Sequence, residues 1–233
     1  MFEFLFLDLD DTILDFHKAE FIAVRKALLA CGVTPTDENV ALYSSINKQH
    51  WQMLERGEIT RDQVKIFRFA RLFEALGVTA DPYATAKNYE VLLGIGHYFL
   101  PGAEEAVAAL SKKYRLFLAS NGTASVQAGR MTSANLYRFF EKTFVSEEIG
   151  ENKPSPAYFQ RCFEQIPNFD PEKALMVGDS LTSDILGGKN AGIRTCWVNP
   201  HHAAAPEGLR PDYEIEALSQ LEGLLEELCA LSI

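Results

Sequence analysis

The stretch FLFLDLDDT, residues 4–12, decides the fold of this chain. Its first four residues are apolar and predict a buried strand, which stops at three carboxylates within four positions. Asp8 and Asp10 alternate with Leu9, so an extended backbone would direct both side chains to the same side. Two like charges so close are unfavourable unless a cation, a proton or a phosphate-binding frame compensates them. The stretch therefore predicts a charged site at the end of a buried strand.

The bulk composition narrows the classes of partner. The chain has 233 residues, 47% of them hydrophobic, which is enough for one large domain or for a core with a smaller insert. It carries 22 basic and 32 acidic residues, a net charge of −10. Nucleic-acid polymers and membrane surfaces require a basic face, so we expect neither as a partner. A small anionic substrate remains compatible, because a few local cations suffice to hold one.

Cysteine usage and the N-terminus favour a cytoplasmic location. The four cysteines are far apart in the sequence and lack the spacing of a metal site, so we expect buried free thiols in a reducing compartment. The apolar N-terminus has no basic leader and is interrupted by Glu3 and Asp8, which argues against a signal peptide. No later stretch is long and apolar enough to cross a bilayer.

The order of the remaining elements predicts an α/β fold. Residues 16–96 show helical spacing only, whereas strands and helices alternate from Leu100 onward. This alternation predicts a parallel sheet with helices on both faces. We expect a core of residues 1–15 and 97–233 and an all-helical insert at 16–96. Helices are expected at 37–55, 61–76, 82–93, 103–112 and 218–228, and strands at 114–119, 142–145, 174–177, 194–198 and 213–215.

Polar residues gather where the predicted strands end. Asp8 and Asp10 follow the first strand, Ser120 and Asn121 the next, and Asp179 a later one. In parallel α/β sheets, ligands bind outside the carboxyl ends of the strands. One carboxylate there can act as a nucleophile, while a second can give and take a proton. The alternatives are a site that only binds a metal, or capping of a helix by Asp11, although capping does not account for Asp8.

A second acidic cluster, Gly178 to Asp184, points to a metal. Together with Asp8 and Asp10, Asp179 and Asp184 would form the all-oxygen site that Mg²⁺ prefers. Asp184 could instead only stabilise a helix N-terminus.

An anionic substrate in so acidic a pocket also requires local cations. Lys153 lies just before a predicted helix N-terminus, with Ser155 as its expected N-cap, in a setting that favours anions. The turn at Ser120, Asn121 and Gly122 adds a hydroxyl and backbone N–H groups at another strand end.

These four pieces, in this order, resemble the motifs of the haloacid dehalogenase-like hydrolase superfamily. Residues 8–12 are similar to its first motif, Ser120 to its second, Lys153 to its third, and residues 178–184 to its fourth. The insert at 16–96 resembles the C1 cap of that family. The resemblance covers the whole chain and implies a Rossmann-like core with an inserted helical cap domain.

The resemblance also implies roles for the acidic residues. Asp8 would attack phosphorus and form an aspartyl-phosphate. Asp10 would protonate the leaving oxygen and later deprotonate the hydrolytic water. Mg²⁺ would be held by the Asp8 carboxylate, the Asp10 main-chain carbonyl and Asp179, with Asp184 in the outer shell.

The remaining motif residues are implied to bind phosphate. Ser120, the Asn121 backbone and Lys153 would hold the transferring phosphoryl oxygens, in keeping with the electrostatic nature of such catalysis.

Four local phrases resemble the pyrimidine 5′-nucleotidase branch of the superfamily, which implies a nucleoside monophosphate as substrate. They are residues 6–16, 57–60, 184–192 and 195–199. A phosphoglycolate or sugar-phosphate phosphatase with the same core is the alternative enzyme. A catalytically silent phosphate- or partner-binding module is the alternative of another class, and the intact set of Asp8, Asp10, Lys153 and Asp179 weighs against it.

Overall fold

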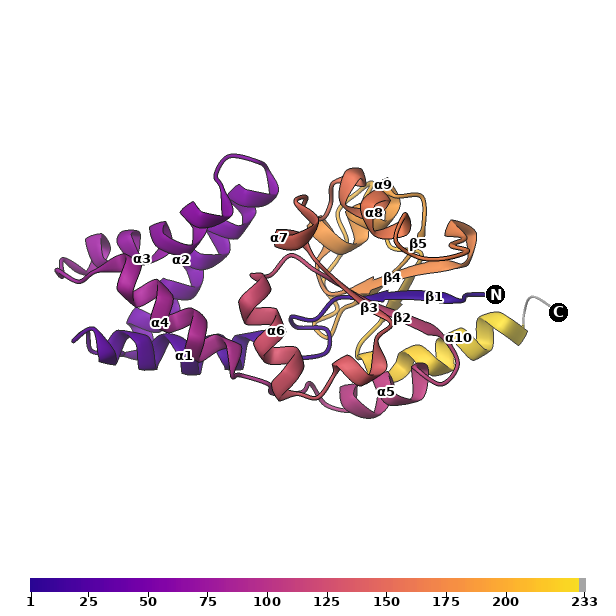
Figure 1. The fold of residues 1–233 in the computed structure, drawn as a ribbon, viewed down its shortest axis with the longest axis horizontal. Coiled ribbons are helices and arrows are strands. Elements are labelled where there is room, and N and C mark those ends of the chain that lie inside the picture. The colour runs from indigo at the N-terminus through magenta and orange to yellow at the C-terminus, as the bar shows by residue number, and fades with distance from the viewer. Residues whose placement is uncertain (231–233) are drawn as a thin grey trace.

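The computed structural model describes residues 1–230 and contains a six-stranded parallel sheet, as the element order predicted (Figure 1). The strand order is β3-β2-β1-β4-β5-β6, and every neighbouring pair is parallel. β1 thus lies inside the sheet, between β2 and β4. The strands are β1 (Phe4–Leu7), β2 (Arg115–Ser120), β3 (Lys142–Val145), β4 (Ala174–Gly178), β5 (Arg194–Val198) and β6 (Tyr213–Ile215).

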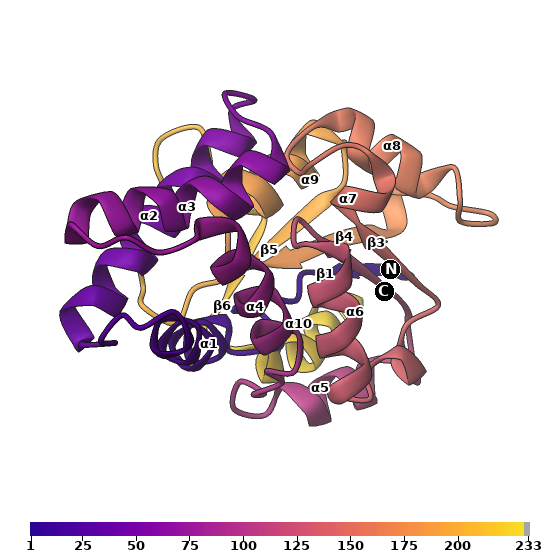
Figure 2. The same ribbon diagram turned by 60° about the vertical axis from the view of Figure 1, so that its left-hand side comes forward.

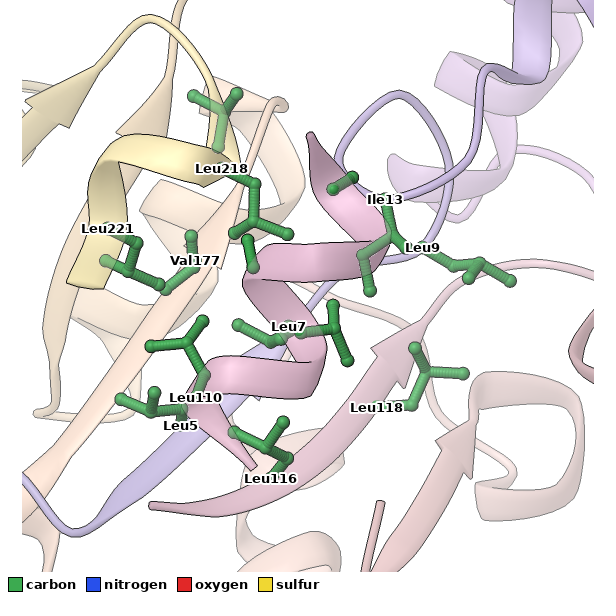
Figure 3. Packing of buried hydrophobic residues seen from close by; sticks show 14 of the residues in the cluster. Leu5, Leu7, Leu9, Ile13, Leu110, Leu116, Leu118, Val177, Leu218 and Leu221 are labelled. Atoms are coloured by element: carbon green, nitrogen blue, oxygen red, sulfur yellow. The ribbon is translucent and has the colours of Figure 1, made fainter. Parts of the chain in front are cut away.

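Both faces of β1 are buried, which explains its continuous apolar run. Successive side chains of a strand point to opposite faces. Leu5 and Leu7 pack in one cluster with residues of α5 (Ala103–Leu110) and α10 (Leu221–Ala230) (Figure 3). Phe4 and Phe6 pack on the other face in a cluster that contains residues of α8 (Pro156–Phe163). Helices therefore cover both faces of the sheet, and the predicted fold class is confirmed.

Four helices follow β1 and lie to one side of the sheet (Figure 1). They have a hydrophobic cluster of their own, which includes Tyr43, Phe69 and Tyr89. Between residues 16 and 95 the structure contains no strand, so the helical character of this segment is confirmed. Its status as a separate domain with boundaries at 16 and 96 stays a prediction. These helices are α1 (Phe16–Ala30), α2 (Asp37–Glu55), α3 (Arg61–Leu76) and α4 (Pro82–Gly94).

Helix α6 (Ala124–Ser133) joins the helical segment to the sheet. Val126 belongs to the hydrophobic cluster of α1–α4, whereas Met131 belongs to the cluster that contains Leu5 and Leu7 of β1. In both views α6 lies beside α4 (Figures 1 and 2). The contact is close: a Cβ atom added at Gly129 would lie 2.6 Å from the Gly94 carbonyl oxygen.

Several predicted boundaries are corrected by the structure. The helix expected at 103–112 ends at Leu110, because the backbone N–H groups of Lys112 and Lys113 donate to carbonyls three residues back, Ala109 and Leu110, in a tighter turn. The helix expected from Leu218 begins with a 3₁₀ turn, Leu218–Gln220, before α10. The short elements are α7 (Ser146–Ile149), α9 (Leu186–Asn190), a π-helical turn (Leu181–Ile185) and further 3₁₀ turns at Tyr137–Phe139 and Pro171–Lys173.

Within residues 1–230, no helix is long and apolar enough to span a membrane. The four cysteines are free thiols, as expected. Cys162 and Cys196 are buried, but Cys31 and Cys229 are half-buried, so the predicted burial is correct for two of them.

Candidate active site

The site begins where β1 ends. The backbone N–H of Asp8 still donates to the Val177 carbonyl of β4 at 2.9 Å, which fixes Asp8 at the carboxyl edge of the sheet. Its side chain is buried, and Oδ1 lies 2.7 Å from Nζ of Lys153. The predicted nucleophile is thus held by a cation from a loop 145 residues away in sequence.

Lys153 is 1% exposed and donates to three acceptors. Its Nζ lies 2.7 Å from Asp8 Oδ1, 2.6 Å from Asp184 Oδ1 and 2.6 Å from the Ala119 carbonyl oxygen. Burial favours the neutral amine, but the two carboxylates outweigh it, and the pKa of Lys153 is raised. With its three protons donated inside the protein, Lys153 acts here by holding Asp8 and Asp184. Its phosphate-binding role stays a prediction.

Asp184 reaches the site because β4 ends in glycine. A Cβ atom on Gly178 would overlap the Asp184 carboxylate, so glycine leaves the space that this side chain fills. The second oxygen of Asp184 accepts from the Ser180 N–H at 3.0 Å. Asp184 itself lies in the π-helical turn that follows β4. Residues Gly178 to Asp184 therefore fold back on themselves, and this local fold positions the Asp184 carboxylate.

Asp8, Asp179 and Asp184 bring one carboxylate oxygen each to within 4.8 Å of one another. Burial raises the pKa of Asp8 to about 8; Lys153 opposes the rise, and the charges of Asp184 and Asp10 add to it. Burial and the charges of Asp184 and Asp8 also raise the pKa of Asp179 well above its ordinary value. Among residues 1–230 the Asp179 carboxylate makes no hydrogen bond or ion pair, so it has capacity for a ligand. A hard divalent cation such as Mg²⁺ fits this cluster, because it would compensate charges that Lys153 alone cannot.

Asp10 turns toward α6 instead of Lys153. Its Oδ2 accepts from Nε2 of Gln127 at 2.7 Å, and its Oδ1 forms an ion pair with Nη1 of Arg130. The Asp10 side chain is 27% exposed, so one part of it faces solvent. The sequence predicted that the side chains of Asp8 and Asp10 project to the same side. In the structure the two carboxylates have separate partners.

The second and third motifs are joined by Asn121. Its side-chain amide donates to the Lys153 carbonyl and accepts from the Lys153 N–H, both at 2.8 Å. Ser120 is buried, and its Oγ accepts from the Gly122 N–H at 3.1 Å and from Gln127 at 2.8 Å. Ser120 is thus linked to Asp10 through Gln127, and Asn121 to Asp8 through Lys153. Phosphate binding by both residues stays a prediction.

Asp11 has a structural position. It adopts a φ of 57°, and its carboxylate accepts from the Phe16 N–H at 2.9 Å, at the start of α1. Asp15 is the N-cap of that helix. Burial raises the pKa of Asp11 to about 6. Asp11 therefore accepts a free N–H at the start of α1, as the capping interpretation expected, while Asp15 occupies the N-cap position itself.

Three residues of the site were not anticipated: Gln127, Arg130 and Arg61, whose Nη1 donates to the Asn121 carbonyl at 2.6 Å. Gln127 and Arg130 are three positions apart on α6, on a face that is otherwise buried and apolar. A charged residue on the apolar face of an amphipathic helix was the available signal. Arg61 had no comparable signal, because it stands at the exposed-looking start of a helix next to Thr60, its N-cap.

The sequence and the fold of this chain are similar to those of known proteins. The family model described as haloacid dehalogenase-like hydrolase matches residues 5–198. A crystal structure of the HAD-hydrolase YfnB from Bacillus subtilis superposes with a TM-score of 0.91 at 38% identity, covering 96% of this chain and 98% of that one. That structure is described as bound to magnesium and as revealing interdomain movement.

Two relatives are named for the class of substrate on which they act. Pyrimidine 5′-nucleotidase PynA of Streptococcus pneumoniae is 36% identical over 97% of this chain and 96% of its own length. Pyrimidine 5′-nucleotidase YjjG of Escherichia coli is 34% identical over 96% of this chain and 97% of its own.

Proposed function

Because this chain belongs to the haloacid dehalogenase-like hydrolase family and is a phosphatase of that family, we propose that it removes phosphate from nucleoside monophosphates, pyrimidine ones foremost. The observation that carries the proposal is the pairing of Asp8 with the buried Lys153 beside Asp179 and Asp184. It presents one carboxylate oxygen at the edge of the sheet, where ligands bind in parallel α/β folds. The names of two relatives support the nucleotide as substrate.

The metal proposed for this site is Mg²⁺. The side chains of Asp8 and Asp179 and the main-chain carbonyl of Asp10 would hold it, with Asp184 beside them. When bound, the ion supplies positive charge that offsets the repulsion between an anionic phosphoryl group and the carboxylates.

The protein residues carry the bond changes in two halves. In the first, an Asp8 oxygen bonds to phosphorus, the ester P–O bond breaks, and Asp10 gives its proton to the leaving oxygen. In the second, water attacks phosphorus, Asp10 accepts the water proton, and the bond between phosphorus and Asp8 breaks. Inorganic phosphate leaves, and both aspartates return to their starting states. Ser120, the Asn121 backbone and Lys153 would hold the phosphoryl oxygens and the nucleophile during both halves.

A cytoplasmic location, with no nucleic-acid polymer or membrane as partner, remains part of this proposal. The acidic net charge of −10 is compatible with a small substrate held by a few local cations.

A panel of phosphate esters tests the proposal. We expect turnover of UMP, CMP and dTMP with Mg²⁺ to exceed that of phosphoglycolate and hexose phosphates, and chelation of the metal to abolish it. Asp8→Asn should remove activity while far-UV circular dichroism stays unchanged. Glu207→Gln, on an exposed loop, is the control and should behave as the parent protein. Preference for phosphoglycolate or sugar phosphates would overturn the proposed substrate. Full turnover by Asp8→Asn would overturn the mechanism. No phosphate release from any ester would overturn the assignment as an enzyme.

A further inference from the structure

We propose that Gln127 and Arg130 of α6 are positioning residues for Asp10, which hold its carboxyl group in the orientation needed to give a proton to the leaving group. This inference rests on the proposed function, in which Asp10 transfers that proton. Neither residue belongs to the four motifs.

Together the two side chains engage both oxygens of Asp10. Gln127 donates from Nε2 to Asp10 Oδ2 at 2.7 Å, and the Arg130 guanidinium pairs with Asp10 Oδ1. A carboxylate held at one oxygen can still rotate about its χ2 bond, but one held at both has its plane fixed. Proton transfer requires the donor within hydrogen-bond reach and correctly oriented, so this restraint bears directly on the leaving-group step.

Gln127 also connects Asp10 to the second motif. The same Nε2 donates to Ser120 Oγ at 2.8 Å. A Cβ atom on Gly122 would overlap the Gln127 side chain, so the turn after Ser120 leaves room for it. The position of Asp10 is thereby tied to the loop that is proposed to bind phosphate.

Arg130 is fully buried, and burying a guanidinium is unfavourable unless the charge is paired. Among the residues that the structure describes, its ion-pair partner is Asp10. Its Nε donates to the Gly96 carbonyl at 2.9 Å, on the segment that leaves α4. An apolar residue would fill an interior position at lower cost, so the stability of α6 alone does not account for the arginine.

Both side chains keep unused polar capacity beside Asp10. Gln127 Oε1 and Arg130 Nη2 are buried and have no hydrogen-bond partner among residues 1–230. A buried donor or acceptor left in this way is costly. A purely structural pair would be expected to satisfy these atoms.

The chemistry of the leaving group supplies a selective test. The sugar oxygen of a nucleotide is a poor leaving group and needs a proton as the ester bond breaks, whereas p-nitrophenolate is stable as an anion. Loss of correct positioning of Asp10 should therefore slow phosphoryl transfer from a nucleotide and spare transfer from p-nitrophenyl phosphate. A general loss of structure would slow both.

The experiment measures leaving-group release in single turnovers with enzyme in excess, which separates this half-reaction from hydrolysis of the intermediate. The variants are Gln127→Met and Arg130→Lys, with Asp10→Asn as the reference and Gln160→Met, an exposed glutamine on α8, as the control. General acid–base catalysis contributes about 10²–10⁴-fold, so we expect uridine release from UMP to fall about 10–100-fold in both variants. Release of p-nitrophenol should stay close to the parent rate, and Gln160→Met should change neither.

Equal slowing of both substrates by Gln127→Met and Arg130→Lys, or slowing of neither, would overturn the inference. Gln127→Met removes no charge, so it decides the matter if Arg130→Lys does not fold. Failure of the proposed function is distinguishable: Asp8→Asn would then remain active, or Asp10→Asn would show no difference between the two substrates. A selective effect in Asp10→Asn that is absent from both α6 variants would overturn this inference alone.

Discussion

Lys153 is a single buried cation that pairs with two carboxylates of the site. Its ammonium group lies between the carboxylates of Asp8 and Asp184, out of contact with solvent. Removing one partner of a buried ion pair leaves the other charge uncompensated, which costs more than the pair contributes when intact. Lys153 should therefore be essential for folding stability as well as for catalysis.

Lys153→Met should lower the free energy of unfolding by about 3–5 kcal/mol, because Asp8 and Asp184 lose their buried cation. Urea denaturation measures this loss, and phosphate release should be abolished in the same variant. Lys189→Met, at an exposed lysine, should shift neither quantity. Equal unfolding midpoints for the two variants would show that the carboxylates do not depend on Lys153.

At the residue scale, the sequence predicted the acidic side chains better than their partners. Asp8, Asp179 and Asp184 follow apolar strands, and the edge of a parallel sheet brings such positions together. Lys153 was recognisable by its motif order. The contact between Arg130 and Asp10 depends on how α6 packs, and no local pattern in the sequence reports that packing.

At the scale of elements, Asp212 links β5 to the segment before β6. Its Oδ2 accepts from the Thr195 N–H at 2.9 Å and from Thr195 Oγ1 at 2.8 Å, while Oδ1 lies 2.7 Å from Nη1 of Arg194. Burial works against the charged carboxylate, but these bonds outweigh it and lower the pKa of Asp212.

This lowered pKa sets the pH dependence of one contribution to stability. The contribution is present above the unfolded-state pKa of about 3.9 and is lost as pH falls through the lower folded-state pKa. Asp212→Asn should therefore cost about 1–2 kcal/mol at pH 7, and the difference from the parent protein should shrink as pH approaches 3. Urea titrations at several pH values test this expectation. A constant difference across that range would contradict it, and Glu207→Gln provides the comparison for a general charge effect.

The elements themselves were largely predictable, because β1 and β4 are apolar and buried on both faces and each helix of residues 16–94 has a clear start. Thr60, for example, caps α3 with Gln63 in a capping box. The π-helical turn at Leu181–Ile185 was not predictable, since its form follows from Asp184 folding back against Gly178. Such a tertiary contact has no periodic signature.

At the scale of the whole molecule, Arg61 connects the helical segment to the site loops. It stands at the start of α3 and donates to the Asn121 and Gly122 carbonyls at 2.6 and 2.9 Å. It also bonds to the side chains of Ser146 and Asn152, next to Lys153. One side chain thus spans from α1–α4 to the second and third motifs.

Arg61→Ala should weaken this connection and allow the helical segment to move away from the sheet. We expect the KM for a nucleoside monophosphate to rise about tenfold, equivalent to about 1.4 kcal/mol, and the radius of gyration in solution scattering to increase. Arg71→Ala, at an exposed position of the same helix, is the matched control. Unchanged KM and unchanged scattering would show that other contacts hold the two parts together.

The position of β1 inside the sheet has a consequence for synthesis on the ribosome. Its parallel partners, β2 and β4, are made long after it, since Phe4 pairs with Arg115 and with Ala174. At about 5–20 residues per second, the apolar FLFL segment waits roughly 5–20 s for its first neighbour. Meanwhile the chain of α1–α4 is completed, with a hydrophobic cluster of its own. We therefore expect nascent chains that stop before β2 to expose this segment and to be the species that chaperones bind.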